Sequence, residues 1–138
     1  MPTNVEIVQA CFAAFQRGDV PAILNMCEDN VEWIEAGDPK SIPFAGRGKG
    51  KSSAAEFFRI VGETSDMLKF EPQQYVASGD RVVALGAWDL RAKATGKVVR
   101  SEWVVDFTVR NGKVTRWQAY YDTAATQAAF AAASKASV

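Results

Sequence analysis

The chain has 138 residues, of which 48% are hydrophobic, and its 16 Lys and Arg residues balance 16 Asp and Glu residues. This length suits a single domain over residues 1–138, because single domains centre near about 100 to 150 residues. A balanced charge gives no long-range positive field, so neither nucleic acid nor a membrane surface is expected as a partner. The longest mostly apolar stretch is shorter than the roughly 20 residues of a membrane helix, and no signal-peptide pattern opens the sequence. We therefore expect a cytoplasmic protein.

The sequence contains no histidine. Histidine-dependent nucleophile pairs, an imidazole base and histidine ligands for zinc or iron are therefore excluded, and acid-base chemistry falls to carboxylates, tyrosines or lysines. We expect neither a metal ion nor a bound cofactor. The two cysteines, Cys11 and Cys27, lack C-x-x-C spacing and lie at apolar positions of predicted helices. Buried thiols are therefore favoured over a disulfide.

The first elements along the chain are two helices. Thr3 and Glu6 match a capping box, and apolar residues then recur with a helical period, which predicts a helix ending at Gly18. Asp19 is a suitable N-cap for a second, short helix with Pro21 in its first turn. Together they predict a helical hairpin.

A short strand and a third helix follow. Apolar and polar residues alternate from Val31 to Glu35, which predicts a strand. The segment from Ala36 to Lys51 is rich in Gly, Pro and Lys and is expected to form a loop. Ser53 and Glu56 match a second capping box, so the third helix is expected to open there.

The rest of the sequence is mainly sheet. Three β-rich runs are separated by Ala-Thr-Gly and Arg-Asn-Gly turns, and they cover about Arg81 to Lys93, Val98 to Arg110 and Lys113 to Asp122. A shorter strand is expected near Phe70 to Ala77, and an alanine-rich helix near the end, with Asp122 as its cap. These elements predict an α+β fold in which three N-terminal helices pack on a curved antiparallel sheet. Whether the curved sheet encloses an open pocket or a filled core is left open by the periodicity.

Four segments resemble those of a known superfamily. They are Phe15-Gln-Arg-Gly-Asp19, Glu28-Asp-Asn-Val-Glu-Trp33, Phe44-Ala-Gly-Arg-Gly48 and Asn111-Gly-Lys-Val-Thr-Arg-Trp-Gln-Ala-Tyr-Tyr-Asp122. Over nearly its whole length the chain is similar to the NTF2-like superfamily, and within it to the SnoaL-like and ketosteroid-isomerase-like proteins. The resemblance implies a cone-shaped α+β domain. It says less about function, because the superfamily includes isomerases, cyclases, hydrolases and binding modules without activity.

The resemblance, with the alternation along each strand, implies which residues face the inside of the cone. All four tryptophans are among them, which favours a pocket for a flat hydrophobic ligand. The residues expected to bind that ligand are Trp33, Trp88, Ser101, Trp103, Val105, Trp117 and Tyr121. The alternative is ordinary core packing, because large aromatic side chains are mostly buried.

Glu35 is the residue that we expect to be catalytic. Its position is similar to that of the aspartate base in ketosteroid isomerases and of a water-holding asparagine in related hydrolases. A carboxylate in an aromatic pocket is hard to ionise, and a raised pKa suits proton transfer near neutral pH. The alternative is a surface glutamate at the end of a strand.

Other parts of the sites in these relatives are missing here. Ketosteroid isomerases form an oxyanion hole from a tyrosine and a protonated aspartate, but the matching positions hold Cys11 and Val105. The Asp-Arg-Asp group of the similar epoxide hydrolases is also absent, since Ala119, Gly86 and Trp88 occupy its positions. Neither of these two reactions is therefore expected.

The segment Gly46-Arg-Gly-Lys-Gly-Lys-Ser52 matches only the end of a phosphate-binding loop. Ala45 replaces its first glycine and no apolar strand immediately precedes it, so a solvated turn is favoured over nucleotide binding.

The outer face of the sheet is expected to mix charged and apolar side chains, with Arg91, Arg100, Glu102, Val104 and Asp106. Relatives commonly dimerise through this face, so the resemblance implies a homodimer. We expect a SnoaL-like enzyme that acts without a cofactor on a small hydrophobic or polyketide-like molecule. Two alternatives remain: a binding module without activity that uses the same pocket, and an assembly or stress-related protein whose cone is filled.

Overall fold

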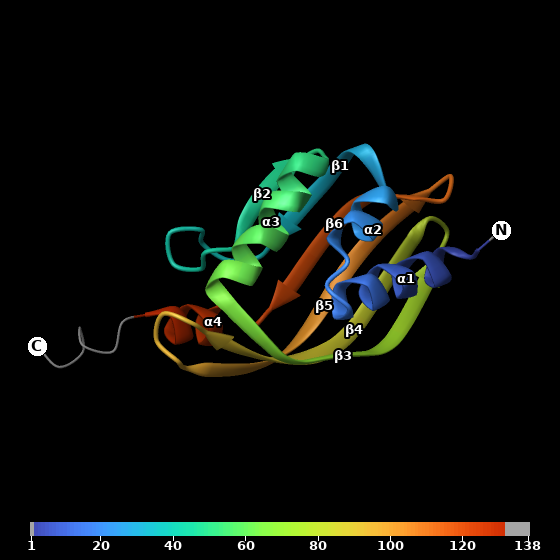
Figure 1. Ribbon diagram of the computed structural model, residues 1–138. Helices are drawn as coiled ribbons and strands as arrows, with labels where there is room; N and C mark the ends of the chain where they lie inside the picture. Colours follow the sequence, from blue (N-terminus) through green and yellow to red (C-terminus); the bar gives the residue numbers. More distant parts are fainter. Residues whose placement is uncertain (1, 132–138) are drawn as a thin grey trace, which may run out of the picture.

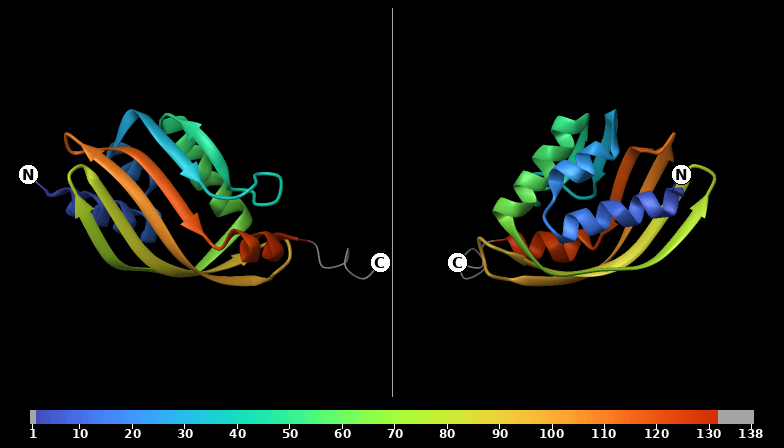
Figure 2. Two further views of the ribbon diagram at one scale, coloured as in Figure 1. Left: turned by 180° about the vertical axis from the view of Figure 1, so that it is seen from behind. Right: turned by 45° about the vertical axis from the view of Figure 1, so that its right-hand side comes forward.

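The computed structural model describes residues 2–131 as a curved six-stranded sheet with helices packed in its hollow (Figure 1). In both views of Figure 2, the sheet wraps around the first three helices, and the fourth helix lies at one end of the sheet. This is the predicted α+β cone, in which the helices cover one face of the sheet. No helix within these residues is long and apolar enough to cross a membrane.

The first two helices begin at the predicted caps. Helix α1, Asn4–Gln16, is preceded by Thr3, whose hydroxyl accepts a hydrogen bond from the Glu6 backbone, while the Glu6 carboxylate accepts one from the Thr3 backbone. Helix α2, Val20–Asn25, begins after Asp19, whose carboxylate accepts the backbone N–H of a residue in the first turn at 3.2 Å. The capping-box and N-cap predictions are therefore confirmed.

The start of the third helix differs from the prediction. Helix α3, Lys51–Thr64, begins two residues before Ser53, and its N-cap is Gly50, which has no side chain to accept a hydrogen bond. The Ser53 hydroxyl instead donates to the backbone oxygen of Lys49 at 3.0 Å. The predicted capping box is therefore wrong, because Ser53 already lies inside the helix and its hydroxyl is bonded to Lys49.

The six strands form one sheet in the order β2-β1-β6-β5-β4-β3. Their bounds are β1 Cys27–Glu35, β2 Gly46–Lys49, β3 Ser65–Ser78, β4 Arg81–Ala92, β5 Val98–Arg110 and β6 Lys113–Tyr121. The three long runs near the C-terminus pair as consecutive antiparallel hairpins, as predicted. Strands β1 and β3 are longer than predicted, since pairing continues beyond the residues that alternate clearly.

Two features of the sheet were not predicted. Gly46–Lys49, which was expected to be part of a loop, pairs antiparallel with the end of β1 as the edge strand β2. Strand β1 also pairs with β6 in parallel, with Trp33 opposite Trp117 and Glu35 opposite Ala119. The sheet is therefore antiparallel except at this one junction, where residues distant in the sequence are brought together.

The helix at the end of the described chain is α4, Thr123–Phe130, and the predicted cap is confirmed. The Asp122 carboxylate accepts the backbone N–H of Ala125 at 2.9 Å. The Thr95 hydroxyl, in the turn between β4 and β5, donates to the backbone oxygen of Ala129 at 2.6 Å. These contacts fix α4 against one end of the sheet.

The two faces of the sheet differ in character. The inner face and the first three helices supply a continuous aromatic and aliphatic core. Cys11 and Cys27 are buried and free, as predicted, but Cys27 begins strand β1 and does not lie in a helix. Burial raises the pKa of Cys11 to about 12 and that of Cys27 to about 11. On the outer face, Arg100 is paired with Asp89 at 2.8 Å. The cone is therefore apolar inside and charged outside.

Candidate functional site

Glu35 lies at the end of β1 with its side chain inside the cone. Only 5% of the residue is exposed, and the indole N–H of Trp117 donates to Glu35 Oε2 at 2.9 Å. Trp33, two residues earlier on the same face, stacks on Trp117 with ring centroids 4.3 Å apart and 16° between the ring planes. Glu35 and Trp33 thus both face inward, as the strand alternation predicts. Catalysis by Glu35 and ligand binding by Trp33 remain predictions.

Burial controls the protonation of this site. Removal from water raises the pKa of Glu35 to about 8, and the hydrogen bond from Trp117 opposes only part of that increase. Burial also raises the pKa of Tyr121, with the nearby Glu35 carboxylate adding to the shift. Near neutral pH, Glu35 therefore holds its proton, and the Tyr121 phenol stays neutral.

Two separate spaces adjoin Glu35. An inner cavity of about 40 Å³ lies between the helices and the sheet, and an outer groove of about 290 Å³ runs between β2 and α3. Glu35, Phe44 and Phe57 line both spaces. Phe44 comes from the loop 36–45 and Phe57 from α3, and their ring centroids are 6.2 Å apart. These three residues form the wall between the cavity and the groove.

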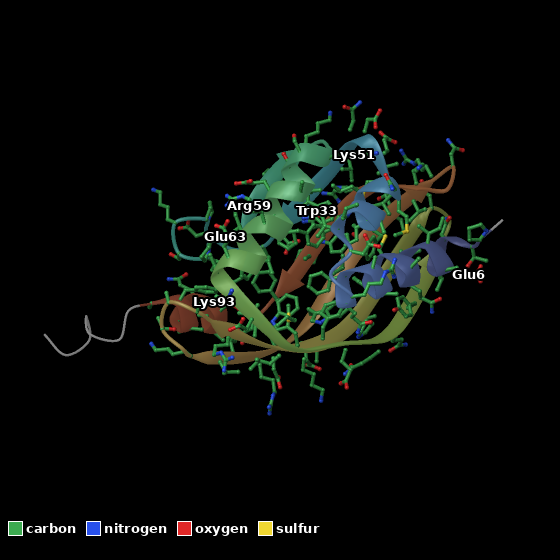
Figure 3. All side chains as sticks on the ribbon, viewed as in Figure 1. Glu6, Trp33, Lys51, Arg59, Glu63 and Lys93 are labelled. Atoms are coloured by element: carbon green, nitrogen blue, oxygen red, sulfur yellow. The ribbon has the colours of Figure 1, made fainter. Side chains whose placement is uncertain are left out.

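The residues predicted to bind a ligand are divided between these spaces. Trp88, Val105 and Trp117 line the inner cavity with Glu35. Trp33 lines the outer groove and lies beneath α3, where its ring centroid is 5.7 Å from that of Phe57 (Figure 3). Together with the predicted catalytic residue Glu35, four of the predicted ligand-binding residues therefore line the two spaces.

The other three predicted residues lie nearby but line neither space. Trp103 is 1% exposed and stacks on Phe70 with ring centroids 5.0 Å apart. The Ser101 hydroxyl accepts the backbone N–H of Asp122 at 2.9 Å, at the start of α4. The Tyr121 hydroxyl donates to the backbone oxygen of Ala36. In this arrangement the two hydroxyl groups hold the backbone.

Most of the inner wall comes from residues that were not predicted as site residues. Five phenylalanines on helices or the loop line the cavity: Phe12, Phe15, Phe44, Phe57 and Phe58. Phe57, Phe58 and Val61 recur with helical spacing in the sequence, but that pattern is typical of any packed helix face and does not indicate a ligand. Phe44 lies in a segment rich in Gly and Pro, so no periodic pattern marked it.

The indole groups leave hydrogen-bond donors unused. The buried Nε1 atoms of Trp33, Trp88 and Trp103 have no acceptor within residues 2–131. An unpaired buried donor costs about 1–3 kcal/mol, so an oxygen acceptor that reached one of these atoms would be stabilised there. Within the same residues, no cluster of Cys, Asp and Glu is arranged to hold a metal ion.

Comparison with known proteins places this arrangement in a family. An NTF2-like protein of Burkholderia xenovorans LB400 is 34% identical, with a TM-score of 0.82, covering 93% of this chain and 95% of that protein. The TerC protein, crystallised with polyporic acid, is 27% identical, with a TM-score of 0.83, covering 92% of this chain and 97% of TerC. An uncharacterised protein of Mycobacterium tuberculosis H37Rv is 26% identical over 93% of this chain and 96% of its own length. The family model of the SnoaL-like domain matches residues 8–117. The chain belongs to the SnoaL-like domain family.

Proposed function

We propose that this protein binds a small hydrophobic, polyketide-like molecule and transfers a proton with Glu35, without a metal ion or a bound cofactor. One observation carries the proposal: Glu35 is a buried carboxyl group among aromatic rings, with its pKa raised to about 8. A general acid or base is most effective when its pKa is close to the working pH. Glu35 meets that condition because burial, and not a charged neighbour, raises its pKa.

The proposed reaction is an isomerisation or cyclisation that begins by converting a ketone to its enol. Glu35 donates its proton to the carbonyl oxygen of the substrate, and the resulting carboxylate removes a proton from the adjacent carbon. The acid is thereby restored and no net proton is consumed. The Trp117 N–H, which already bonds Glu35 Oε2, stabilises the carboxylate between the two transfers.

The lining of the two spaces supports a substrate of this class. The inner wall consists mainly of aromatic and aliphatic side chains, which favours a flat apolar molecule. The free indole N–H of Trp88 lies in that wall and is suited to a carbonyl or enol oxygen. TerC, which was crystallised with polyporic acid, supports the expectation of an aromatic, oxygen-bearing ligand.

The experiment screens polyporic acid and a panel of aromatic ketones for quenching of tryptophan fluorescence. Each ketone that binds and carries hydrogen on the carbon beside its carbonyl is then incubated with the protein in deuterated water, and exchange at that carbon is followed by NMR. Glu35→Gln should slow enzyme-dependent exchange by about 10² to 10⁴-fold while leaving binding nearly unchanged. Glu28→Gln, on the exposed part of β1, is the matched control and should have no effect.

The outcomes separate the proposal from its alternatives. Binding without exchange in the wild-type protein would indicate a binding module that uses the same pocket. No binding across the panel at sub-millimolar concentration would indicate a filled cone. Equal exchange by wild type and Glu35→Gln would remove Glu35 from the chemistry.

A further inference from the structure

We infer that the ligand site has two parts: the groove between β2 and α3 takes the aromatic ring of the substrate, and the inner cavity takes one small ketone group, whose oxygen binds the indole N–H of Trp88. This inference rests on the proposed function, because it places the ketone beside Glu35. It adds a substrate class, namely uncharged aromatic molecules that carry a short acyl group such as acetyl.

The volume of the inner cavity limits what can enter it. That volume is about 40 Å³, which exceeds the roughly 10–15 Å³ that one water molecule needs but is far below the roughly 150 Å³ of a cavity that binds benzene. The cavity therefore suits a group of a few atoms and is too small for an aromatic ring. The adjoining groove, at about 290 Å³, has room for the ring.

The polar groups of the inner cavity are few. Of the described residues that line it, three carry a polar hydrogen on the side chain: Glu35, Trp88 and Trp117. The Trp117 N–H is already donated to Glu35 Oε2 at 2.9 Å. Trp88 is 7% exposed, and its Nε1 has no acceptor within residues 2–131. A group that enters this cavity therefore meets one free N–H donor and one carboxylic acid in an otherwise apolar wall.

These two groups match the chemistry of a ketone. A ketone oxygen has two lone pairs and no hydrogen, so it can accept the Trp88 N–H and the Glu35 proton together. An amine would instead bring N–H donors, for which the Glu35 carboxyl is the one acceptor among the lining side chains. A charged group would lose its hydration without gaining a counter-ion, since the raised pKa of Glu35 keeps that residue uncharged near neutral pH.

The floor of the groove suits a flat ring. On β2, Gly46 and Gly48 pair with Glu35 and Trp33 and share their face of the sheet. The positions of β2 that face α3 therefore carry no side chain, and the groove remains between the strand and the helix. Phe57 and other apolar residues form much of the rest of its wall.

The charges around the groove favour an uncharged ring. The Glu56 carboxylate lines the groove and is already bound by Arg59 through two hydrogen bonds of 2.8 and 2.6 Å. Arg47 pairs with Ile34 in the register of the sheet, so its side chain lies on the outer face, away from α3. An anionic substituent on the ring would therefore lose hydration beside Glu56 without a free cation to replace it.

Phe57 lies between the two parts of the site. Glu35, Phe44 and Phe57 line both spaces. Phe44 is 5% exposed and packs against rings on β6 and α4, so it is held in place. Phe57 is only partly buried, and side chains near the surface change rotamer rapidly. Rotation of Phe57 would let an acyl group pass from the groove to Trp88.

NMR of ¹⁵N-labelled protein at pH 7 tests the inference, because each of the four tryptophans gives its own indole N–H signal. Acetophenone and ethylbenzene have the same ring and similar size, but only acetophenone has a carbonyl oxygen. Acetophenone should shift the Trp88 indole proton downfield, as a new hydrogen bond does, whereas ethylbenzene should cause no downfield shift. Isobutyrophenone, whose branched acyl group is too large for the cavity, should cause none either.

Two tryptophan variants provide a second measurement. Trp88→Phe removes the donor and keeps an aromatic ring, and it should weaken the binding of acetophenone about fivefold relative to that of ethylbenzene, as expected for one neutral hydrogen bond. Trp103→Phe is the matched control, because Trp103 also has an unpaired N–H but lines neither space. It should leave the ratio of the two affinities unchanged. The indole shifts are measured on the wild type, so they decide the matter even if a variant does not fold.

Each possible result decides a specific point. The inference would be overturned by a downfield shift at Trp33 in place of Trp88, by no shift at Trp88 up to the solubility of acetophenone, or by equal effects of the two variants. Hydrogen exchange beside the acetophenone carbonyl reports the proposed function separately. If Trp88 responds but Glu35→Gln leaves that exchange unaltered, the chemistry fails and the binding mode stands. If exchange depends on Glu35 while Trp88 does not respond, the chemistry stands and this inference is wrong.

Discussion

The buried position of Glu35 has a cost in stability that depends on pH. Between about pH 4.5 and 8 the unfolded chain has released the Glu35 proton, whereas the folded protein retains it. The unfolded state then binds fewer protons, so the free energy of unfolding should fall by about 1.4 kcal/mol per pH unit across this window from this group. Below pH 4.5 the group is neutral in both states, and above pH 8 it is charged in both.

Glu35→Gln should remove this pH dependence. Urea unfolding at pH 5, 6, 7 and 8 should give the wild type a steeper decline in stability than the variant. The buried amide shifts the absolute stability at every pH, so the slope is the informative quantity. Glu28→Gln should retain the wild-type slope, since Glu28 is exposed on the same strand. Parallel slopes for wild type and Glu35→Gln would contradict a protonated Glu35.

Gly86 sets the position of the most buried tryptophan. A Cβ atom at this position would overlap the Trp103 ring and the backbone oxygen of Glu71. Gly86→Ala should therefore destabilise the fold by about 1–3 kcal/mol through overpacking. Gly62→Ala, where the added methyl group meets nothing within 4 Å in helix α3, should instead stabilise it by about 0.5–1 kcal/mol. Thermal unfolding of the two variants should show opposite shifts in Tm.

At the scale of single residues, the sequence predicted the orientation of Glu35, Trp33 and Trp117, because alternation along a strand determines which face each side chain takes. It did not predict the partners of Ser101 and Tyr121. Their hydroxyl groups bond to backbone atoms of distant elements, and those distances depend on the curvature of the sheet. An inward-facing polar side chain can therefore bond to the protein backbone, and its orientation alone does not show that it binds a ligand.

Among the elements, α4 offers a direct test of its cap. Asp122→Ala removes the acceptor for the Ala125 backbone and should cost about 1 kcal/mol. Asp122→Asn retains a side-chain oxygen at the same position and should lose much less. Hydrogen exchange in Thr123–Phe130 should be faster in the alanine variant than in the asparagine variant. Equal exchange in both would show that α4 is held by its packing alone.

The long hairpins were predictable because their turns and their alternation are local signals. Strand β2 was not, since its sequence Gly-Arg-Gly-Lys has no apolar face and becomes a strand only by pairing with β1. The parallel pairing of β1 with β6 joins segments about 80 residues apart, as the Trp33–Trp117 register shows. No local pattern encodes that contact.

For the whole molecule, we expect a homodimer formed through the outer face of the sheet. Asp89 and Asp106 on this face already pair with Arg100 and Arg81 in the same chain, so charge reversal there would also disturb the monomer. Tyr120 is a cleaner probe, because it is 46% exposed and takes part in no ion pair.

Light scattering at micromolar concentration should give about 30 kDa, which is twice the 15.0 kDa of the chain. Tyr120→Glu should reduce the mass to that of the monomer, whereas Gln9→Glu, exposed on helix α1 on the other side of the sheet, should not. A monomer mass for the wild type would remove the dimer, and dissociation by both variants would argue against an interface centred on Tyr120.

The open or filled state of the cone could not be predicted from the sequence. It depends on how rings from α1, α3 and the loop 36–45 meet the sheet, and these elements are placed by tertiary packing. The structure gives a small cavity beside Glu35 and a larger groove outside it. Both spaces adjoin the one buried acid on which the proposed function depends.

The most direct test of this account is therefore the titration of Glu35 itself. NMR of protein labelled with ¹³C at glutamate carboxyl groups follows each side chain from pH 4 to 9, and Glu35→Gln identifies the signal of Glu35 by its loss. We predict a midpoint at about pH 8, with the Trp117 indole N–H signal changing at the same pH because it donates to that carboxyl group. A midpoint near the ordinary value of 4.5 would contradict the account.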